Sequence, residues 1–139
     1  MNPKTVIFVH SYCLNGSEPN KGQRLTWMAR EAARTASRIA NEKTIRDIIF
    51  SAAYDTAKRE FRLCCDQTPE WVRNHLILGI KDSKDEIVRA IVLAISMGAN
   101  KIMVVADRWH ARRSKILFGA HCPVEIEVEF VTFKTPQFE

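Results

Sequence analysis

Asp107, Trp109, His110 and Arg113 lie close together in a polar segment that follows an apolar run. His110 and Arg113 are spaced i, i+3, so they share one face of a helix. Imidazole and guanidinium groups donate hydrogen bonds to phosphate and carboxylate, and a helix N-terminus binds the same anions. The segment therefore predicts an anion-binding site. A second interpretation of Asp107 has equal weight: its side chain could serve only as the N-cap that accepts the backbone N–H of His110.

Other polar side chains follow apolar segments elsewhere in the chain. His10 and Ser11 follow the first such segment, Ser51 lies at the end of the second, and Ser83 follows the third. In an open parallel sheet the carboxyl ends of the strands meet at one edge, where ligands bind. We therefore expect these side chains to surround one pocket together with the polar segment that contains His110.

Nucleophilic catalysis and metal binding are weaker alternatives for the same residues. Ser11, Cys13 and Ser51 are candidate nucleophiles with either histidine as base, but no G-x-S-x-G elbow is present. The two histidines could bind a metal together with Asp107, although such a site would need ligands from several loops, and no metal is predicted. Neither G-x-G-x-x-G nor a Walker motif occurs, so no cofactor is identified from a phosphate loop.

The elements that would position these residues follow from the hydrophobic pattern. Short apolar segments rich in β-branched residues alternate with segments whose apolar residues recur at helical spacing. Predicted strands cover residues 4–10, 46–53, 76–80, 102–106 and 124–133, and predicted helices cover about 23–41, 56–66, 83–98 and the segment after Asp107. This alternation predicts a three-layer α/β/α sandwich with a five-stranded, mainly parallel, doubly wound Rossmann-like sheet.

Local motifs make sharper predictions at four places. Ser83 and Glu86 match the S-x-x-E capping box, which favours Ser83 as an N-cap over a ligand-binding role. Residues 69–74 begin with proline, which is common at the first position of a helix, and could form a short helix. Gly98 is expected to end the preceding helix. Residues 124–133 alternate apolar and polar side chains, which predicts an edge strand with one face toward water.

Composition limits the class of protein. The length of 139 residues favours one domain that spans residues 1–139. The net charge of +5 is compatible with anionic ligands and does not require nucleic acid. The N-terminus does not match a signal peptide and no apolar stretch reaches the ~18 residues of a membrane span, so we expect no membrane contact and a cytoplasmic location. The four cysteines form no CxxC pair and are interpreted as reduced thiols, mostly in the core.

The segment VVADRWHARRSKILF resembles the hallmark of the YdcF/SanA/ElyC-like family, a group of bacterial Rossmann-like domains largely without assigned function. That hallmark is a strand, a short polar turn with an aromatic residue and a histidine, and an arginine on the following helix. Positions similar to the family's motifs are Arg24, Ser51, Ser83, Trp109, His110 and Arg113. The resemblance implies the strand order 3-2-1-4-5, a pocket over the first and fourth strands, and a nucleotide-like or phosphorylated ligand.

Two functions of different classes follow. The first is a domain that binds a small nucleotide-like or phosphorylated molecule at the carboxyl ends of the parallel strands, with enzymatic activity and oligomeric state left open. The alternative is a nucleic-acid or protein interaction module that uses a basic surface. The basic side chains that suggest it are Arg30, Arg34, Arg38, Arg108, Arg112 and Lys115.

Overall fold

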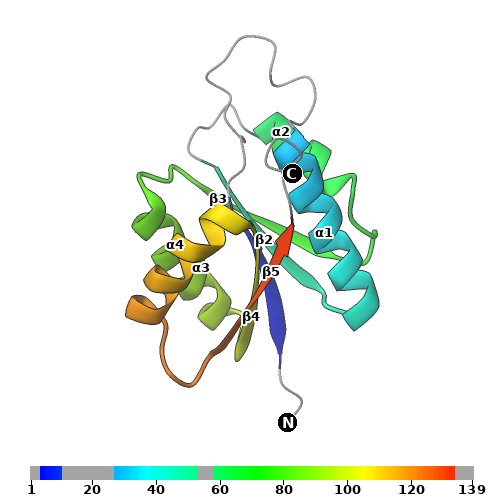
Figure 1. Ribbon diagram of the computed structural model, residues 1–139. Helices are drawn as coiled ribbons and strands as arrows, with labels where there is room; N and C mark the ends of the chain where they lie inside the picture. The colour runs from blue at the N-terminus through cyan, green and yellow to red at the C-terminus, as the bar shows by residue number, and fades with distance from the viewer. Residues whose placement is uncertain (1–3, 11–26, 53–57, 134–139) are drawn as a thin grey trace.

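The chain is described by a computed structural model that covers residues 4–10, 27–52 and 58–133 (Figure 1). Its elements in these residues are β1 (Thr5–Val9), α1 (Trp27–Lys43), β2 (Asp47–Ala52), α2 (Lys58–Cys65), β3 (Arg73–Leu78), α3 (Ser83–Ser96), β4 (Lys101–Asp107), α4 (Arg108–His121) and β5 (Glu127–Phe133). Every strand pair is parallel and the order is β3-β2-β1-β4-β5. The predicted fold class and strand order are therefore confirmed.

Alternate residues of the strands build two apolar cores, one on each face of the sheet. Helices α1 and α2 cover the face formed by Ile7, Val9, Ile48, Phe50, Met103 and Val105. Helices α3 and α4 cover the face formed by Val6, Phe8, Ile49, Ile102 and Val104. Strands β1 and β4 are buried on both faces, which explains why their sequences are continuous apolar runs.

Two helices carry exposed apolar side chains. Val92 and Ile95 of α3 are exposed, so this helix is not largely covered by its neighbours. Ile116 of α4 is 73% exposed, whereas Phe118 is buried against the sheet. The apolar residues of α4 therefore do not all face the core, because only one stripe of a surface helix packs against the sheet. No helix in the described part of the chain is long and apolar enough to cross a membrane.

Residues 69–74 do not form the expected short helix. The backbone N–H of Val72 closes a turn onto the Pro69 carbonyl at 3.1 Å, and the Arg73 N–H donates to the Arg46 carbonyl at 2.6 Å. Strand β3 therefore begins at Arg73, earlier than predicted, and it pairs with β2 along its whole length. Pairing with β2 satisfies more backbone groups than a single helical turn could, since helix nucleation is costly.

Strand β5 forms an edge of the sheet, as predicted, but it is shorter than the alternating pattern. It begins at Glu127, and Val124 lies outside the strand with 94% of its surface exposed. Glu127 and Glu129 face water and bind Lys101, each with an N···O distance of 3.0 Å. Val131, which follows these glutamates along β5, packs against the core under α1. The solvent-exposed face of the strand is therefore limited to its first residues.

The described cysteines form no disulfide bond with one another. Cys64 is buried in the core under α1, and Cys65 and Cys122 are half-buried. Burial raises the pKa of Cys65, with a smaller contribution from the charge of Asp66, and burial also raises the pKa of Cys122. The raised pKa keeps the Cys65 and Cys122 thiols protonated at neutral pH. Cys13 lies outside the described residues.

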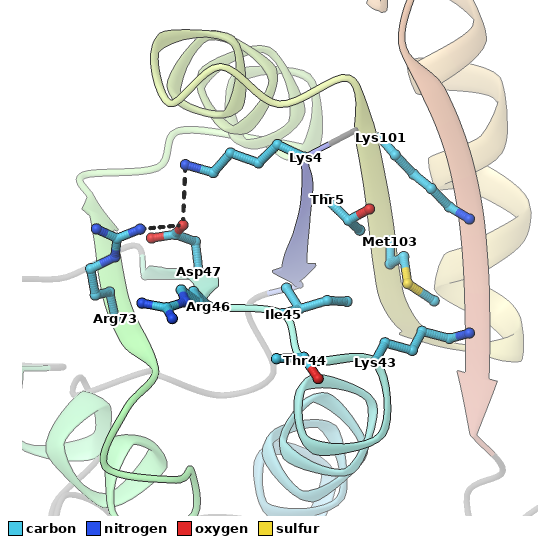
Figure 2. A pocket seen from close by; sticks show the side chains of 10 residues that line it. All are labelled: Lys4, Thr5, Lys43, Thr44, Ile45, Arg46, Asp47, Arg73, Lys101 and Met103. Atoms are coloured by element: carbon cyan, nitrogen blue, oxygen red, sulfur yellow. Dashed lines mark hydrogen bonds and ion pairs between the residues drawn. The ribbon is translucent and has the colours of Figure 1, made fainter. Parts of the chain in front are cut away.

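A buried carboxylate joins three strands at the amino-terminal edge of the sheet. Asp47, the first residue of β2, is 1% exposed. It accepts a hydrogen bond from Arg73 of β3 at 3.0 Å and lies 3.3 Å from Lys4, just before β1 (Figure 2). It also accepts a hydrogen bond from His75 of β3 at 2.9 Å. Burial alone would raise the pKa of Asp47, but the hydrogen bonds from His75, Arg73 and Lys4 outweigh burial and lower it.

Helix α1 ends in a left-handed residue that is not glycine. Thr44 has φ +56°, and the Ile45 N–H donates back to the Ala40 carbonyl at 3.0 Å. Helix α3 ends in the same type of motif with the expected Gly98 at φ +80°, followed by a bond from Ala99 to the Ala94 carbonyl at 3.0 Å. A β-branched residue in this conformation is strained, whereas glycine is not.

We expect Asp47→Asn to lower the free energy of unfolding by about 1–3 kcal/mol at neutral pH. Because the pKa of Asp47 is lowered in the folded state, its contribution is present above the unfolded value of ~3.9 and is lost as the pH falls through the folded value. Urea unfolding at neutral pH and at pH ~3 should show a difference from wild type that shrinks at low pH. Exposed Asp66→Asn is the matched control, and an equal loss at both pH values would contradict the assignment.

Thr44→Gly should raise the free energy of unfolding by about 1 kcal/mol, because glycine adopts the left-handed conformation without strain. The reciprocal control is Gly98→Ala, which should lower it by a similar amount, since nothing lies within 4 Å of the added Cβ and only the backbone conformation resists. Thermal unfolding followed by circular dichroism measures both changes. A Thr44→Gly variant less stable than wild type would show that the threonine side chain makes a stabilising contact.

Candidate functional site

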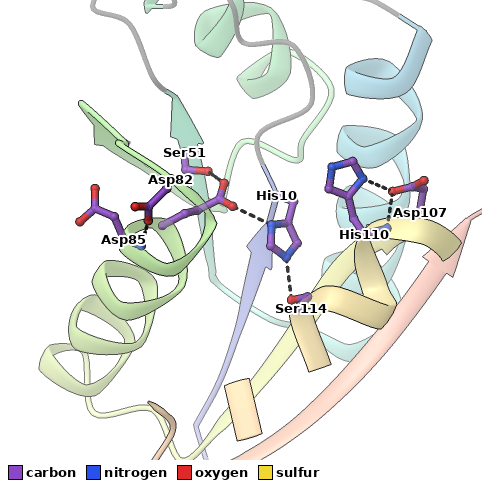
Figure 3. A network of polar contacts seen from close by, with 8 residues as sticks. His10, Ser51, Asp82, Asp85, Asp107, His110 and Ser114 are labelled. Atoms are coloured by element: carbon purple, nitrogen blue, oxygen red, sulfur yellow. Dashed lines mark hydrogen bonds and ion pairs between the residues drawn. The ribbon is translucent and has the colours of Figure 1, made fainter. Parts of the chain in front are cut away.

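The candidate site lies at the carboxyl ends of β1, β2 and β4, beside the first turns of α3 and α4 (Figure 3). The structure brings together four of the predicted residues there. His10 follows β1, Ser51 lies in β2, and Asp107 ends β4. The rings of His10 and His110 have centroids 6.3 Å apart. The sheet therefore gathers at one edge residues that are far apart in the sequence.

His10 is buried and both of its ring nitrogens have partners. Its Nδ1 lies 2.8 Å from Oε1 of Glu86, and its Nε2 lies 2.8 Å from Oγ of Ser114. The hydroxyl of Ser51 donates to the other carboxylate oxygen of Glu86. When Glu86 is ionised it can only accept, so Nδ1–H of His10 donates to it, and in the neutral tautomer of that ring Nε2 accepts from the Ser114 hydroxyl. This series of hydrogen bonds fixes the orientation of the His10 ring.

Glu86 is the central residue of this network, although its spacing from Ser83 predicts that it belongs to a capping box. The structure corrects that interpretation. The N-cap of α3 is Asp82, whose side chain accepts the Asp85 N–H at 2.7 Å, and Ser83 is already the first helical residue. Glu86 belongs instead to the buried stripe of α3, with Ile87, Ala90, Ile91 and Ala94. Glu86 precedes Ile87 and lies four residues before Ala90, so its helical spacing places it on the apolar face of α3. This spacing is the sequence signal that could have identified Glu86 as a buried residue.

Ser114 was also missed. It is 2% exposed and belongs to the buried stripe of α4 with Ala111 and Phe118. A serine at helical spacing between two core positions faces the sheet, and this spacing is visible in the sequence. Ser83, in contrast, is half-buried at the start of α3.

Asp107 is the N-cap of α4, which confirms one of its two interpretations. Its Oδ1 accepts the backbone N–H of His110 at 3.2 Å, and the same oxygen lies 2.6 Å from Nδ1 of the His110 ring. Asp107 is buried, whereas the His110 side chain is 54% exposed. One carboxylate therefore caps the helix and orients an imidazole that reaches the surface.

Trp109 and Arg113 are exposed on α4 on either side of His110. Trp109 presents 59% of its surface, a large aromatic area for a residue beside a buried network. Ser11 and Arg24 lie outside the described residues. No group of three or more His, Cys, Asp or Glu side chains in the described ranges is placed to hold a metal ion.

The chain Ser114–His10–Glu86 has the connectivity of a hydrolase triad, but its burial argues against that chemistry. A nucleophilic serine must reach the substrate, whereas Ser114 is 2% exposed and Ser51 is fully buried. The Ser51 hydroxyl also donates its hydrogen bond to Glu86 rather than to a histidine. The network is therefore better suited to positioning elements than to covalent catalysis.

The parallel sheet, its order and the helices on both faces define a Rossmann-like α/β domain. Comparison with models of protein families, with curated proteins and with solved structures finds no significant match. The resemblance to the YdcF/SanA/ElyC-like family therefore stays a prediction that rests on the segment around His110.

Glu86→Ala should lower the free energy of unfolding by about 2–5 kcal/mol, because buried His10 and Ser51 would both lose their acceptor. The stability of Glu86→Gln should lie between those of Glu86→Ala and wild type. Its single amide oxygen can accept from His10 or from Ser51, whereas the carboxylate accepts from both. Urea unfolding measures the three proteins. Asp85→Ala, one position away and partly exposed, is the control and should change stability by about 1 kcal/mol or less. Equal losses at the two positions would show that the network is not stabilising.

Proposed function

We propose that the chain is a small-molecule binding domain whose ligand carries a phosphate or similar anionic group. The ligand would lie against the first turn of α4, at the carboxyl ends of β1 and β4. The observation that carries this proposal is the half-exposed His110, oriented by Asp107 at 2.6 Å and placed beside the fixed ring of His10. Preorganised donors bind anions with a smaller loss of side-chain entropy.

Three further features of α4 support an anionic, nucleotide-like ligand. The helix runs for 14 residues and directs its N-terminal N–H groups toward this edge. Arg113 is exposed on the next turn after His110 and adds a guanidinium suited to phosphate. Trp109 offers an exposed indole on which a planar ring can stack.

The carboxylates near the site are already engaged by donors. Asp107 accepts the backbone N–H of His110 and lies against the ring of the same residue. Asp85 lies 3.7 Å from Arg89 and accepts the Lys81 N–H at 3.0 Å. Glu86 is occupied by His10 and Ser51. The proposal includes no reaction, although a histidine oriented by a carboxylate is also the arrangement of a general acid–base.

The basic stripe of α1 supports the nucleic-acid alternative less well. Arg34 lies 3.6 Å from Glu31, and Arg38 lies 3.8 Å from Glu42, so neighbouring carboxylates offset both charges. Binding to a phosphate backbone depends on cations that can replace counterions. We therefore prefer the small-molecule proposal to nucleic-acid binding. The cytoplasmic location of the protein is a separate prediction.

A panel of nucleotides and sugar phosphates should contain a compound that raises the melting temperature of the protein. At a concentration of 100 times Kd the stabilisation should be ~2.7 kcal/mol. The His110→Ala/Arg113→Ala double variant should lose this shift, because it removes both exposed donors. Arg112→Ala/His121→Ala removes the same residue types from other positions of α4 and should keep it. A shift that survives in the first double variant would place the ligand elsewhere.

A further inference from the structure

A pocket with a volume of about 330 Å³ lies at the edge of the sheet opposite His110, between the C-terminal end of α1 and the amino-terminal ends of the strands (Figure 2). Its lining includes the cationic side chains Lys4, Lys43, Arg46, Arg73 and Lys101. Among the described residues of that lining, Asp47 is the only carboxylate. Such a concentration of like charge in a concave surface attracts anions strongly.

The carboxylates of this region leave two cations without a partner. Asp47 is shared among Lys4, Arg73 and His75, and Lys101 is held by Glu127 and Glu129. Lys43 and Arg46 are exposed and form no ion pair with any carboxylate in the described part of the chain. The C-terminal end of α1 supplies only about half a negative charge. The pocket therefore keeps a net positive charge.

The cations stand at two ends of the pocket. Lys4, Arg46 and Arg73 gather around Asp47, whereas Lys43 and Lys101 extend toward β5 (Figure 2). Thr5, Ile45 and Met103 lie between the two groups (Figure 2). Asp47 holds Lys4 and Arg73 in place, and Arg73 uses only part of its five-donor guanidinium for this contact. Strained Thr44 also lines the pocket, and such strain is concentrated at binding sites.

We propose that this pocket binds a small molecule with two or more anionic oxygen groups, of the diphosphate or bisphosphate type. Cations at both ends fit separated negative groups better than a single one. The volume is at the lower end of small-molecule sites, which span roughly 300–1,000 Å³. The site is distinct from the one at His110, because the two lie at opposite ends of the parallel strands.

The test is a calorimetric titration with inorganic pyrophosphate at low ionic strength. The His110→Ala/Arg113→Ala background removes the donors of the other site, so binding there does not contribute. In this background we expect binding that weakens at least about tenfold in Lys43→Gln/Arg46→Gln, because charge-assisted hydrogen bonds are lost. Arg34→Gln/Arg38→Gln removes the same charge from α1 outside the pocket and should keep the affinity within about twofold, since exposed charges at a distance are screened.

Amide chemical shifts locate the bound anion. Pyrophosphate should shift the resonances of Thr44, Asp47 and Lys101 and leave those around Asp107 unchanged. The proposal is overturned by no binding, by equal weakening in the two charge-matched variants, or by shifts confined to the edge that contains Asp107. Tighter binding of a DNA duplex than of pyrophosphate would also overturn it. None of these outcomes depends on whether a ligand binds at His110.

Discussion

The arrangement of the carboxyl edge depends on one buried charge. The carboxylate of Glu86 lies in a low-dielectric interior, where it is tolerated only with hydrogen-bond donors at both oxygens. His10 and Ser51 provide those donors, and His10 extends the chain to Ser114. Because these residues belong to α3, the end of β1, β2 and α4, the requirement fixes how both helices approach the sheet. The position of His110 at the surface follows from that fixed approach.

The opposite edge uses a buried carboxylate in a different way. Asp47 is as deeply buried as Glu86, but its partners Lys4 and Arg73 reach into solvent. At the carboxyl edge the donors are buried side chains, so the network rigidifies the interior. At the amino-terminal edge the donors are cations that can serve a second partner. A buried carboxylate therefore stabilises the interior at the carboxyl edge, whereas at the amino-terminal edge it positions cations that can bind a ligand.

The strands were predictable because β1 and β4 are apolar on both faces, and such runs occur in buried parallel strands. Their order did not follow from this pattern and was implied only by the resemblance of the segment around His110. The polar side chains that end these strands were identifiable from the same apolar runs. Glu86 was not, since Asp82 and Ser83 are both residue types that cap helices, and the S-x-x-E spacing favoured Ser83, whereas Asp82 is the N-cap in the structure. Residues 69–74 show the same limit: proline permits a helix start there, but pairing with β2 at Arg73 determines the structure. Local patterns define elements well, whereas long-range contacts choose among equivalent local solutions.

The parallel pairing of β1 also determines the order in which this chain can fold. Strand β1 is synthesised first and lies between β2 and β4. Its contact with β4 joins positions as distant as Lys4 and Asn100, which are 96 residues apart and hydrogen-bonded at 2.8 Å. During synthesis, one edge of the most apolar strand stays open until β4 has left the ribosome. Non-local pairing of this kind slows folding and leaves strand edges exposed. The nascent chain is therefore most vulnerable to aggregation before its fourth strand is made, although the finished sheet buries β1 completely.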